Sequence, residues 1–343
     1  MVLDKTILGY IGSKRLIIDF VVETIQSVAG KNTNLTFCDL FGGTNIVGAT
    51  FKGLGYKVIS NDLMNYSYVI AKHLIENNEN SIKLDDRILG LADRLNNLSG
   101  IHGKITENFC PSGKDKRKFF TDENGQKADA IRLTIEKWRG NGSLSENEYY
   151  WFLASLISNL DKVANTASVY GAYLKEFKKS AKRVLEFSLL PIVKGNIGKV
   201  YQGDANSLIN EISGDILYLD PPYNTRQYSQ NYHVLESIAL YDDHKLLGVS
   251  GCRDEPHKKS NYCKKKMAIK ALTDLLANAN FIHTFMSYST EGIMSIDDIK
   301  SVFKRHFDEF KIFERAHKKY KSNNRDVLIK EPLKEIIFYG RKR

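Results

Sequence analysis

Residues 35–62 read LTFCDLFGGTNIVGATFKGLGYKVISND, and this stretch decides the fold. Its apolar run 35–41 predicts a buried strand that ends at a pair of glycines. A helix over about 45–54 is expected next, and then a second strand over 56–60 that ends at an Asn-Asp pair. Strand, helix and strand in this order form a βαβ unit, which implies a parallel sheet with a right-handed crossover.

The rest of the chain continues this alternation but is interrupted once. A helix to about residue 76 follows the second strand, and strand signals then thin out from about 80 to 198. Within that stretch, segments 145–163 and 170–189 carry Leu, Ile, Val and aromatic residues at helical spacing, which predicts a mainly helical insertion. Strand patterns return at residues 199–203, 215–219, 281–288, 311–315 and 335–340.

These patterns predict a chain of three regions. Residues 1–80 hold the first half of the sheet, 81–197 form the helical insertion, and 198–343 hold the second half. No clear helix separates the last two strands, so we expect them to pair antiparallel at one edge. The predicted fold class is α/β: a doubly wound, mostly parallel sheet with an antiparallel edge strand and a mainly helical insertion.

The composition narrows the cellular setting and the partners. The 343 residues carry a formal net charge of +10, which favours a polyanionic partner such as nucleic acid. No signal-peptide pattern and no apolar run of about 18 residues occurs, so we expect a cytoplasmic protein without a membrane partner. The four cysteines form no C-x-x-C pair, and no metal is expected because the spacing fits no usual zinc site at His244, Cys252, His257 and Cys263.

Acidic residues mark the ends of three expected strands. Asp39 lies within the first, Asp62 follows the second and Asp220 follows a later one. Ligands of a doubly wound sheet bind outside the carboxyl ends of its strands, so these carboxylates are expected to converge on one crevice. Gly42 lets the backbone approach a ligand, and Asp62, about 20 residues on, suits hydrogen bonds from ribose hydroxyls. The pattern indicates a nucleoside cofactor; the alternative is that the glycines only form a tight turn.

Residues 217–224, LYLDPPYN, form the candidate catalytic loop. Pro221 and Pro222 fix φ twice and offer carbonyl groups without N–H groups, so the loop is stiff and rich in acceptors. The Asp220 carboxylate and a carbonyl such as that of Pro221 would accept the two hydrogens of an exocyclic amino group and aim its lone pair at an electrophilic methyl group. Tyr223 would stack on a base extruded from a duplex. The alternative is a rigid turn without chemistry.

Several segments together resemble the Dam-type N6-adenine DNA methyltransferases, in their restriction-modification branch. The resemblance implies a Rossmann-like methyltransferase sheet, S-adenosylmethionine as methyl donor, double-stranded DNA as substrate, monomeric action and a cognate restriction endonuclease as a further partner. Asp220 favours adenine over cytosine, because relatives that act on cytosine more often carry Ser there. The matching motifs cover most of the sheet in the family's order: Gly9–Lys14, Cys38–Asn45, Asn61-Asp62, Tyr201–Asp204, Asp220–Tyr228, Asn231–Glu236 and Ser287–Gly292.

The resemblance also assigns a set of cofactor-binding residues. One departure concerns Asn45, since many relatives have Ala-Gly-Thr-Gly after the Phe-Gly pair where this chain has Gly-Thr-Asn. Two assignments have structural alternatives: Lys14 as a solvated lysine at a helix start, and Asp204 as a helix cap. The residues that would contact the methionine end, the amino-acid pocket, the ribose and the adenine ring are, in that order, Tyr10 and Lys14, Asp39 and Gly42, Asp62, and Asp204.

Two basic segments are candidates for DNA contact. The loop 241–270 contains a stretch of lysines without acidic residues, which suits phosphate contacts; the alternative is a solvated loop. The insertion 81–197 is the expected target-recognition region, and its basic run 114–118 would follow a DNA backbone. His233 and Glu236 share a helical face after the catalytic loop and are expected to support it without taking part in the reaction. The expected DNA-binding lysines are Lys258, Lys259, Lys264, Lys265 and Lys266.

Three rival functions remain open on the sequence. The same chemistry can act on the N4 amino group of cytosine in DNA, or on adenine in RNA. A relative that has lost turnover would only bind nucleic acid. The intact loop 220–223, together with Asp62, argues against the inactive relative, because such a protein would be free to lose both.

Overall fold

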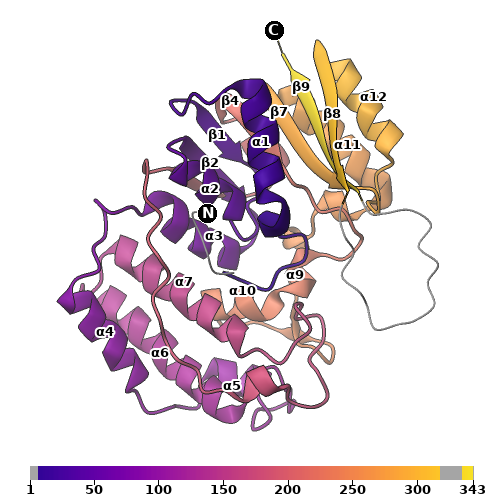
Figure 1. Ribbon diagram of the computed structural model, residues 1–343. Helices are drawn as coiled ribbons and strands as arrows, with labels where there is room; N and C mark the ends of the chain where they lie inside the picture. The colour runs from indigo at the N-terminus through magenta and orange to yellow at the C-terminus, as the bar shows by residue number, and fades with distance from the viewer. Residues whose placement is uncertain (1–6, 317–333, 343) are drawn as a thin grey trace.

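A computed structural model describes residues 7–316 and 334–342. Its centre is a seven-stranded sheet, which lies in the upper half of Figure 1. Every strand expected from the sequence is present, with ends that shift by one or two residues. The strands are β1 (Thr36–Asp39), β2 (Lys57–Asp62), β3 (Lys199–Gln202), β4 (Ser213–Leu219), β7 (Asn280–Ser289), β8 (Glu309–Ala316) and β9 (Lys334–Arg341).

The sheet has the strand order β3-β2-β1-β4-β7-β9-β8, and its first five strands run parallel. The βαβ unit predicted from residues 35–62 is confirmed: β1 and β2 pair in parallel and are joined by α2 (Ile46–Gly53). β1 lies between β2 and β4, so the carboxyl ends of these three strands are neighbours. The chain reverses its direction of winding at this point, which is where doubly wound sheets bind ligands.

The last two strands pair antiparallel, as expected, and they extend the sheet beyond β7. β9 pairs antiparallel with both β7 and β8, so it lies inside the sheet and β8 forms the edge. β8 is consequently parallel to β7 although the two do not touch in the ladder. The strand that comes last in the sequence is thus enclosed by two earlier ones.

Two hydrophobic cores cover the two faces of the sheet. Successive strand residues point to opposite faces, and accordingly Phe37 belongs to one core and Cys38 to the other. The first face packs against α2, α1 (Ile18–Ala29) and α3 (Asn65–Ala71), which continues into a π-helical turn Lys72–Glu76. The second face packs against α8 (Ala205–Leu208), α11 (Lys265–Asn278) and α12 (Ile296–His306).

The insertion forms a helical layer below the sheet in Figure 1. It contains α4 (Asp86–Asn96), α5 (Lys104–Phe109), α6 (Asp122–Gly140) and α7 (Glu146–Lys162). A capping box at Ser145 starts α7, where the Ser145 side chain accepts from the Glu148 N–H and the Glu148 side chain accepts in return. α7 packs against α3 and α10 (His233–Leu240), which connects the insertion to the sheet half that carries the candidate catalytic loop.

The prediction of a helix over residues 170–189 is wrong. This segment is irregular apart from a short 3₁₀ turn, Lys179–Lys182. Side-chain amides of the underlying helices bind its backbone: Asn124 accepts from the Leu185 N–H at 2.8 Å, and Asn96 accepts from the Phe187 N–H at 2.8 Å. The apolar residues of this segment therefore pack an extended stretch of chain onto the helices and do not form one face of a helix.

Two short elements follow the candidate catalytic loop. α9 (Tyr228–Asn231) leads into α10, and a small hairpin of β5 (Leu246–Leu247) and β6 (Cys252–Arg253) packs against both helices. The buried Arg117 guanidinium binds the hairpin backbone at the carbonyls of Gly248 and Val249. Across residues 7–316 and 334–342, no helix combines the length and apolar character that crossing a membrane requires.

Candidate active site

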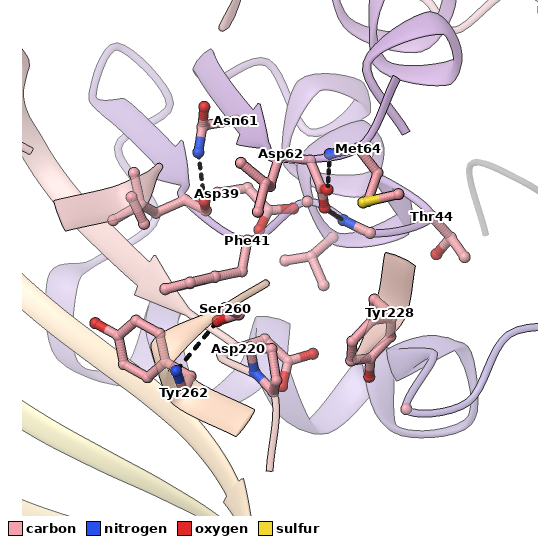
Figure 2. Close-up of a pocket in the computed structure, with 18 of the residues that line it drawn as sticks. Asp39, Phe41, Thr44, Asn61, Asp62, Met64, Asp220, Tyr228, Ser260 and Tyr262 are labelled. Atoms are coloured by element: carbon pink, nitrogen blue, oxygen red, sulfur yellow. Dashed lines mark hydrogen bonds between the residues drawn. The ribbon is translucent and has the colours of Figure 1, made fainter. Parts of the chain in front are cut away.

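A cavity of about 910 Å³, counting its open mouth, lies at the carboxyl ends of β1, β2 and β4. Asp39, Asp62 and Asp220 all line it, so the expected convergence of the strand ends is observed. Figure 2 shows these three carboxylates around the cavity, with Phe41 and Tyr262 on one side and Tyr228 on the other.

The glycine turn after β1 forms one wall of the cavity. A Cβ added to Gly42 would lie 2.5 Å from the Asn45 side-chain oxygen, so the turn leaves no room for a larger residue. Asp62 closes the turn by accepting from the Gly43 N–H at 2.8 Å and the Met64 N–H at 2.9 Å. A carboxylate has about four acceptor positions, and Asp62 keeps some of them for a ligand.

Asn45 has a structural reason for its departure from the family's glycine. It adopts the left-handed conformation with φ 59°, which Asn tolerates better than other residues with a side chain. Its side chain is fully buried, donates to the Ser67 carbonyl at 3.1 Å and accepts from the Ser60 hydroxyl at 2.6 Å. Asn therefore keeps the backbone conformation of the turn and adds hydrogen bonds that Gly lacks.

Burial changes the acid strength of the carboxyl groups in the cavity. Asp39 is 1% exposed and accepts from the Gly48 N–H at 3.1 Å. Burial raises the pKa of Asp39 to about 7, against the lowering effect of that hydrogen bond. Burial also raises the pKa of Asp62 above its ordinary value. A cation in the cavity would favour the ionised form of both groups.

Lys14 forms an ion pair with the candidate catalytic carboxylate. Its Nζ lies 3.0 Å from Asp220 Oδ1 and 3.9 Å from Glu335 Oε2 on β9. Burial raises the pKa of Asp220 to about 6, while the Lys14 ammonium acts in the opposite direction and the Glu335 carboxylate raises it further. Lys14 thus helps to keep Asp220 ionised in a buried position, a partnership that sequence reasoning missed because more than 200 residues separate the two.

Tyrosines form the wall beside the candidate catalytic loop. The Tyr10 ring stacks on Tyr232 with centroids 4.4 Å apart, and Tyr228 lies 5.4 Å from Tyr10. Tyr223 is half-buried beside Gly12, where an added Cβ would approach its ring to 3.2 Å. Tyr10, Pro222 and Tyr228 line the cavity itself, whereas Pro221 and Tyr223 lie next to it.

The opposite wall contains residues that the sequence did not single out as a group. Phe41 and Tyr262 meet edge to face, with centroids 5.1 Å apart, and both line the cavity. Asp204 lies at the same end; it caps α8 by accepting from the Ser207 N–H at 3.1 Å and also lines the cavity. Its two interpretations, a helix cap and a cavity residue, are therefore compatible.

The five expected DNA-binding lysines divide into two groups. Lys259, Lys264, Lys265 and Lys266 are exposed, as phosphate contacts require. Lys258 differs: it is 8% exposed, lines the cavity and forms an ion pair with the fully buried Glu236. A lysine with a buried partner cannot reach phosphates as freely as the other four.

His233 and Glu236 occupy positions that suit the expected supporting role. The two His233 ring nitrogens lie 2.8 Å and 2.7 Å from the carbonyl oxygens of Gln230 and Ser250, which fixes the hairpin against α10. Glu236 accepts from the Asn65 N–H and the Tyr66 N–H, both at 3.1 Å, at the start of α3. Within the described ranges, no cluster of His, Cys, Asp and Glu has an arrangement suited to a metal ion.

The sheet order and a carboxylate-lined cavity at its switch point define the class of Rossmann-like α/β methyltransferases. Comparison with known families is more specific, because residues 10–302 match the model of the D12 class N6 adenine-specific DNA methyltransferases. The chain belongs to this family, and it is an adenine-specific DNA methyltransferase.

Three curated relatives illustrate the similarity. The chain is 42% identical to the type II methyltransferase M.NlaIII of Neisseria lactamica, over 92% of this chain and 93% of that protein. It is 39% identical to the type II methyltransferase M.FokI of Planomicrobium okeanokoites and 35% identical to the modification methylase StsI of Streptococcus sanguinis. It spans nearly all of M.NlaIII but about half the length of the other two, 52% and 51%.

Proposed function

We propose that this protein transfers a methyl group from S-adenosylmethionine to the N6 amino group of adenine within a specific sequence of double-stranded DNA. The observation that carries the proposal is the shared cavity: Asp220 of the catalytic loop lies beside the carboxylates that suit a nucleoside cofactor, Asp39 and Asp62. A base extruded from the duplex would meet the methyl donor inside this cavity.

The residues of the cavity fit S-adenosylmethionine chemically. A Cβ on Gly42 would collide with the Asn45 and Ser60 side chains, so glycine is needed for the tight turn whose residues Gly42 and Gly43 line the cavity. The carboxylates match the ribose hydroxyls, the ammonium and the positively charged sulfur of the molecule, and Phe41 with Tyr262 offers an apolar wall to a purine ring. We therefore assign Tyr10, Lys14, Asp39, Gly42, Asp62 and Asp204 to cofactor binding.

The cofactor supplies a methyl group on a positively charged sulfur, which makes the carbon electrophilic. Asp220 and the Pro221 carbonyl would accept hydrogen bonds from the two N6–H groups, which localises the nitrogen lone pair and directs it towards that carbon. As the N–C bond forms, the C–S bond would break with its electron pair left on sulfur, and N6 would release one proton. Lys14 holds Asp220 in its ionised form by the ion pair at 3.0 Å. Pro221 and Pro222 keep the loop stiff, and Tyr223 would stack on the extruded base.

We assign the remaining regions from their position and charge. The insertion 81–197 would read the DNA sequence, and the exposed lysines beside the cavity would contact phosphates. The names of the relatives support a restriction-modification role with a cognate endonuclease as partner. We expect a monomer that methylates one strand at a time, in the cytoplasm.

One experiment tests the reaction directly. The protein is incubated with S-adenosylmethionine that carries a labelled methyl group, together with either genomic DNA or total RNA, and the digested nucleosides are separated. We expect label in N6-methyldeoxyadenosine from the DNA sample. Label in N4-methyldeoxycytidine, label from RNA alone, or no label in either would refute the proposal.

A further inference from the structure

A short segment beside the cavity has two different faces. We call residues 258–262 the strap. Lys258 and Tyr262 are 8% and 3% exposed, and together with the partly buried Ser260 they line the cavity. Lys259 and Asn261, which alternate with them, are exposed. One side of the strap thus closes the cofactor cavity, while the other carries a lysine to the surface that we assign to DNA.

Three separate interactions hold the inner face in place. Lys258 forms an ion pair with Glu236 on α10. Ser260 exchanges two hydrogen bonds with the Gln227 side chain: its carbonyl accepts from Nε2 at 3.1 Å and its N–H donates to Oε1 at 2.8 Å. The Tyr262 hydroxyl donates to Asn206 Oδ1 at 3.0 Å. Gln227 follows the catalytic loop, so the strap is bonded to elements on both sides of the cavity.

The ion pair also connects the strap to the loop that carries Asp62. Glu236 is fully buried, and its two oxygens accept from the Asn65 and Tyr66 N–H groups. Asn65 starts α3 and lies three residues after Asp62. A buried carboxylate is costly without a cation, so Glu236 requires Lys258 for as long as the strap is closed. Opening of the strap would expose Glu236 and loosen the start of α3.

We propose that Lys258 is a positioning residue for the cofactor and that the strap makes cofactor and DNA bind cooperatively. This inference rests on the proposed function. A cofactor bound under the inner face stabilises the closed strap, which presents Lys259 to the phosphates. DNA bound to the outer face stabilises the same closed strap and slows release of the cofactor. Coupling of this kind is reciprocal and is typically 5- to 150-fold in affinity.

The test measures binding, so no turnover is needed. S-adenosylhomocysteine, the demethylated product, is titrated into the full chain by calorimetry with and without linear plasmid DNA. In the wild type we expect DNA to tighten its binding by at least about fivefold. In Lys258→Met we expect weaker binding, by about tenfold, that DNA no longer improves. Lys258→Arg keeps a cation beside Glu236 and is expected to restore most of the coupling.

Lys259→Met is the matched control on the outer face. It is expected to bind S-adenosylhomocysteine like the wild type when DNA is absent, and to lose part of the DNA effect. Lys258→Met leaves Glu236 without a cation, so the double variant Glu236→Gln/Lys258→Met removes both buried charges. Tyr262→Phe keeps the aromatic ring but loses the hydrogen bond to Asn206, which loosens the strap. Both are expected to reduce the coupling.

Two results separate the inference from the proposed function. A wild-type protein that does not bind S-adenosylhomocysteine at all would remove the proposed cofactor, and the inference with it. A wild type that binds it, combined with a Lys258→Met variant of unchanged affinity and unchanged DNA effect, would overturn the inference alone.

Discussion

Asp220 combines two demands that oppose each other in water. In the proposed reaction it lies buried beside an extruded base, and it stays ionised so that it can accept a hydrogen bond from the N6 amino group. Burial raises its pKa to about 6, and Lys14 at 3.0 Å prevents a larger rise. The residue pair, more than the carboxylate alone, is therefore the unit that we expect to set the rate.

The first prediction concerns Asp220 itself. Asp220→Ala removes the acceptor that orients the amino nitrogen, so turnover is expected to fall by at least about 100-fold. DNA binding is expected to remain near the wild-type level, because phosphate contacts supply most of the affinity. Single-turnover methylation and a mobility-shift assay measure the two effects. Retention of turnover in this variant would refute the role of Asp220.

The second prediction concerns Lys14 and pH. Activity needs the ionised form of Asp220, so the rate falls as the pH drops through the pKa of about 6. Removing the Lys14 ammonium in Lys14→Met raises this pKa, and the acidic limb of the pH–rate profile moves to higher pH. The profile is measured at saturating cofactor, so that a change in cofactor affinity does not contribute. Lys14→Arg is the control and is expected to keep the limb near its original position.

At the scale of elements, the turn between β1 and α2 depends on one unusual residue. Asn45→Ala keeps a left-handed residue with a Cβ and loses the bonds to Ser60 and Ser67, so we expect a loss of about 2 kcal/mol in the free energy of unfolding. Asn45→Gly relieves the backbone and is expected to lose less. Urea unfolding of both variants measures the difference, and equal stability of the Ala variant and the wild type would contradict it.

The helices and strands also show which parts of the fold the sequence patterns can predict. All seven main strands were predictable, because each alternates between two buried faces or runs as a short apolar stretch bounded by glycine or polar residues. Residues 170–189 have helical spacing and form no helix, since the pattern cannot reveal that Asn96 and Asn124 bind their backbone. The spacing of apolar residues predicts a helix or strand well when the backbone N–H and C=O groups of that element bond within the regular structure itself.

The same distinction holds for the candidate site. The convergence of Asp39, Asp62 and Asp220 follows from strand topology and was predictable. The partners of Lys14 and Lys258 are 206 and 22 residues away in sequence. Only the packing of separate elements brings each pair together. From the sequence, the family resemblance therefore implied a cofactor contact for Lys14, and the run of lysines indicated a phosphate contact for Lys258.

At the scale of the whole molecule, positive charge beside the cavity is expected to set the salt dependence of DNA binding. Lys264, Lys265 and Lys266 stand at the start of α11, where cations oppose the helix dipole and the first helical turn contains no acidic residue. Their replacement by Gln should leave the fold intact and reduce the slope of log affinity against log salt by about 0.9 for each phosphate that is no longer neutralised. Titrations at several salt concentrations measure this slope, and Arg at all three positions should preserve it.

The position of β9 between β7 and β8 affects folding of the chain during translation. A ribosome delivers β7 and β8 before β9, so the nascent chain carries two strands whose ladder partner has not yet been synthesised. Unpaired strand edges invite pairing with other chains. Glu335, which faces Lys14, also arrives with β9. Translation that stops before β9 would therefore yield a polypeptide with exposed strand edges that is prone to aggregation.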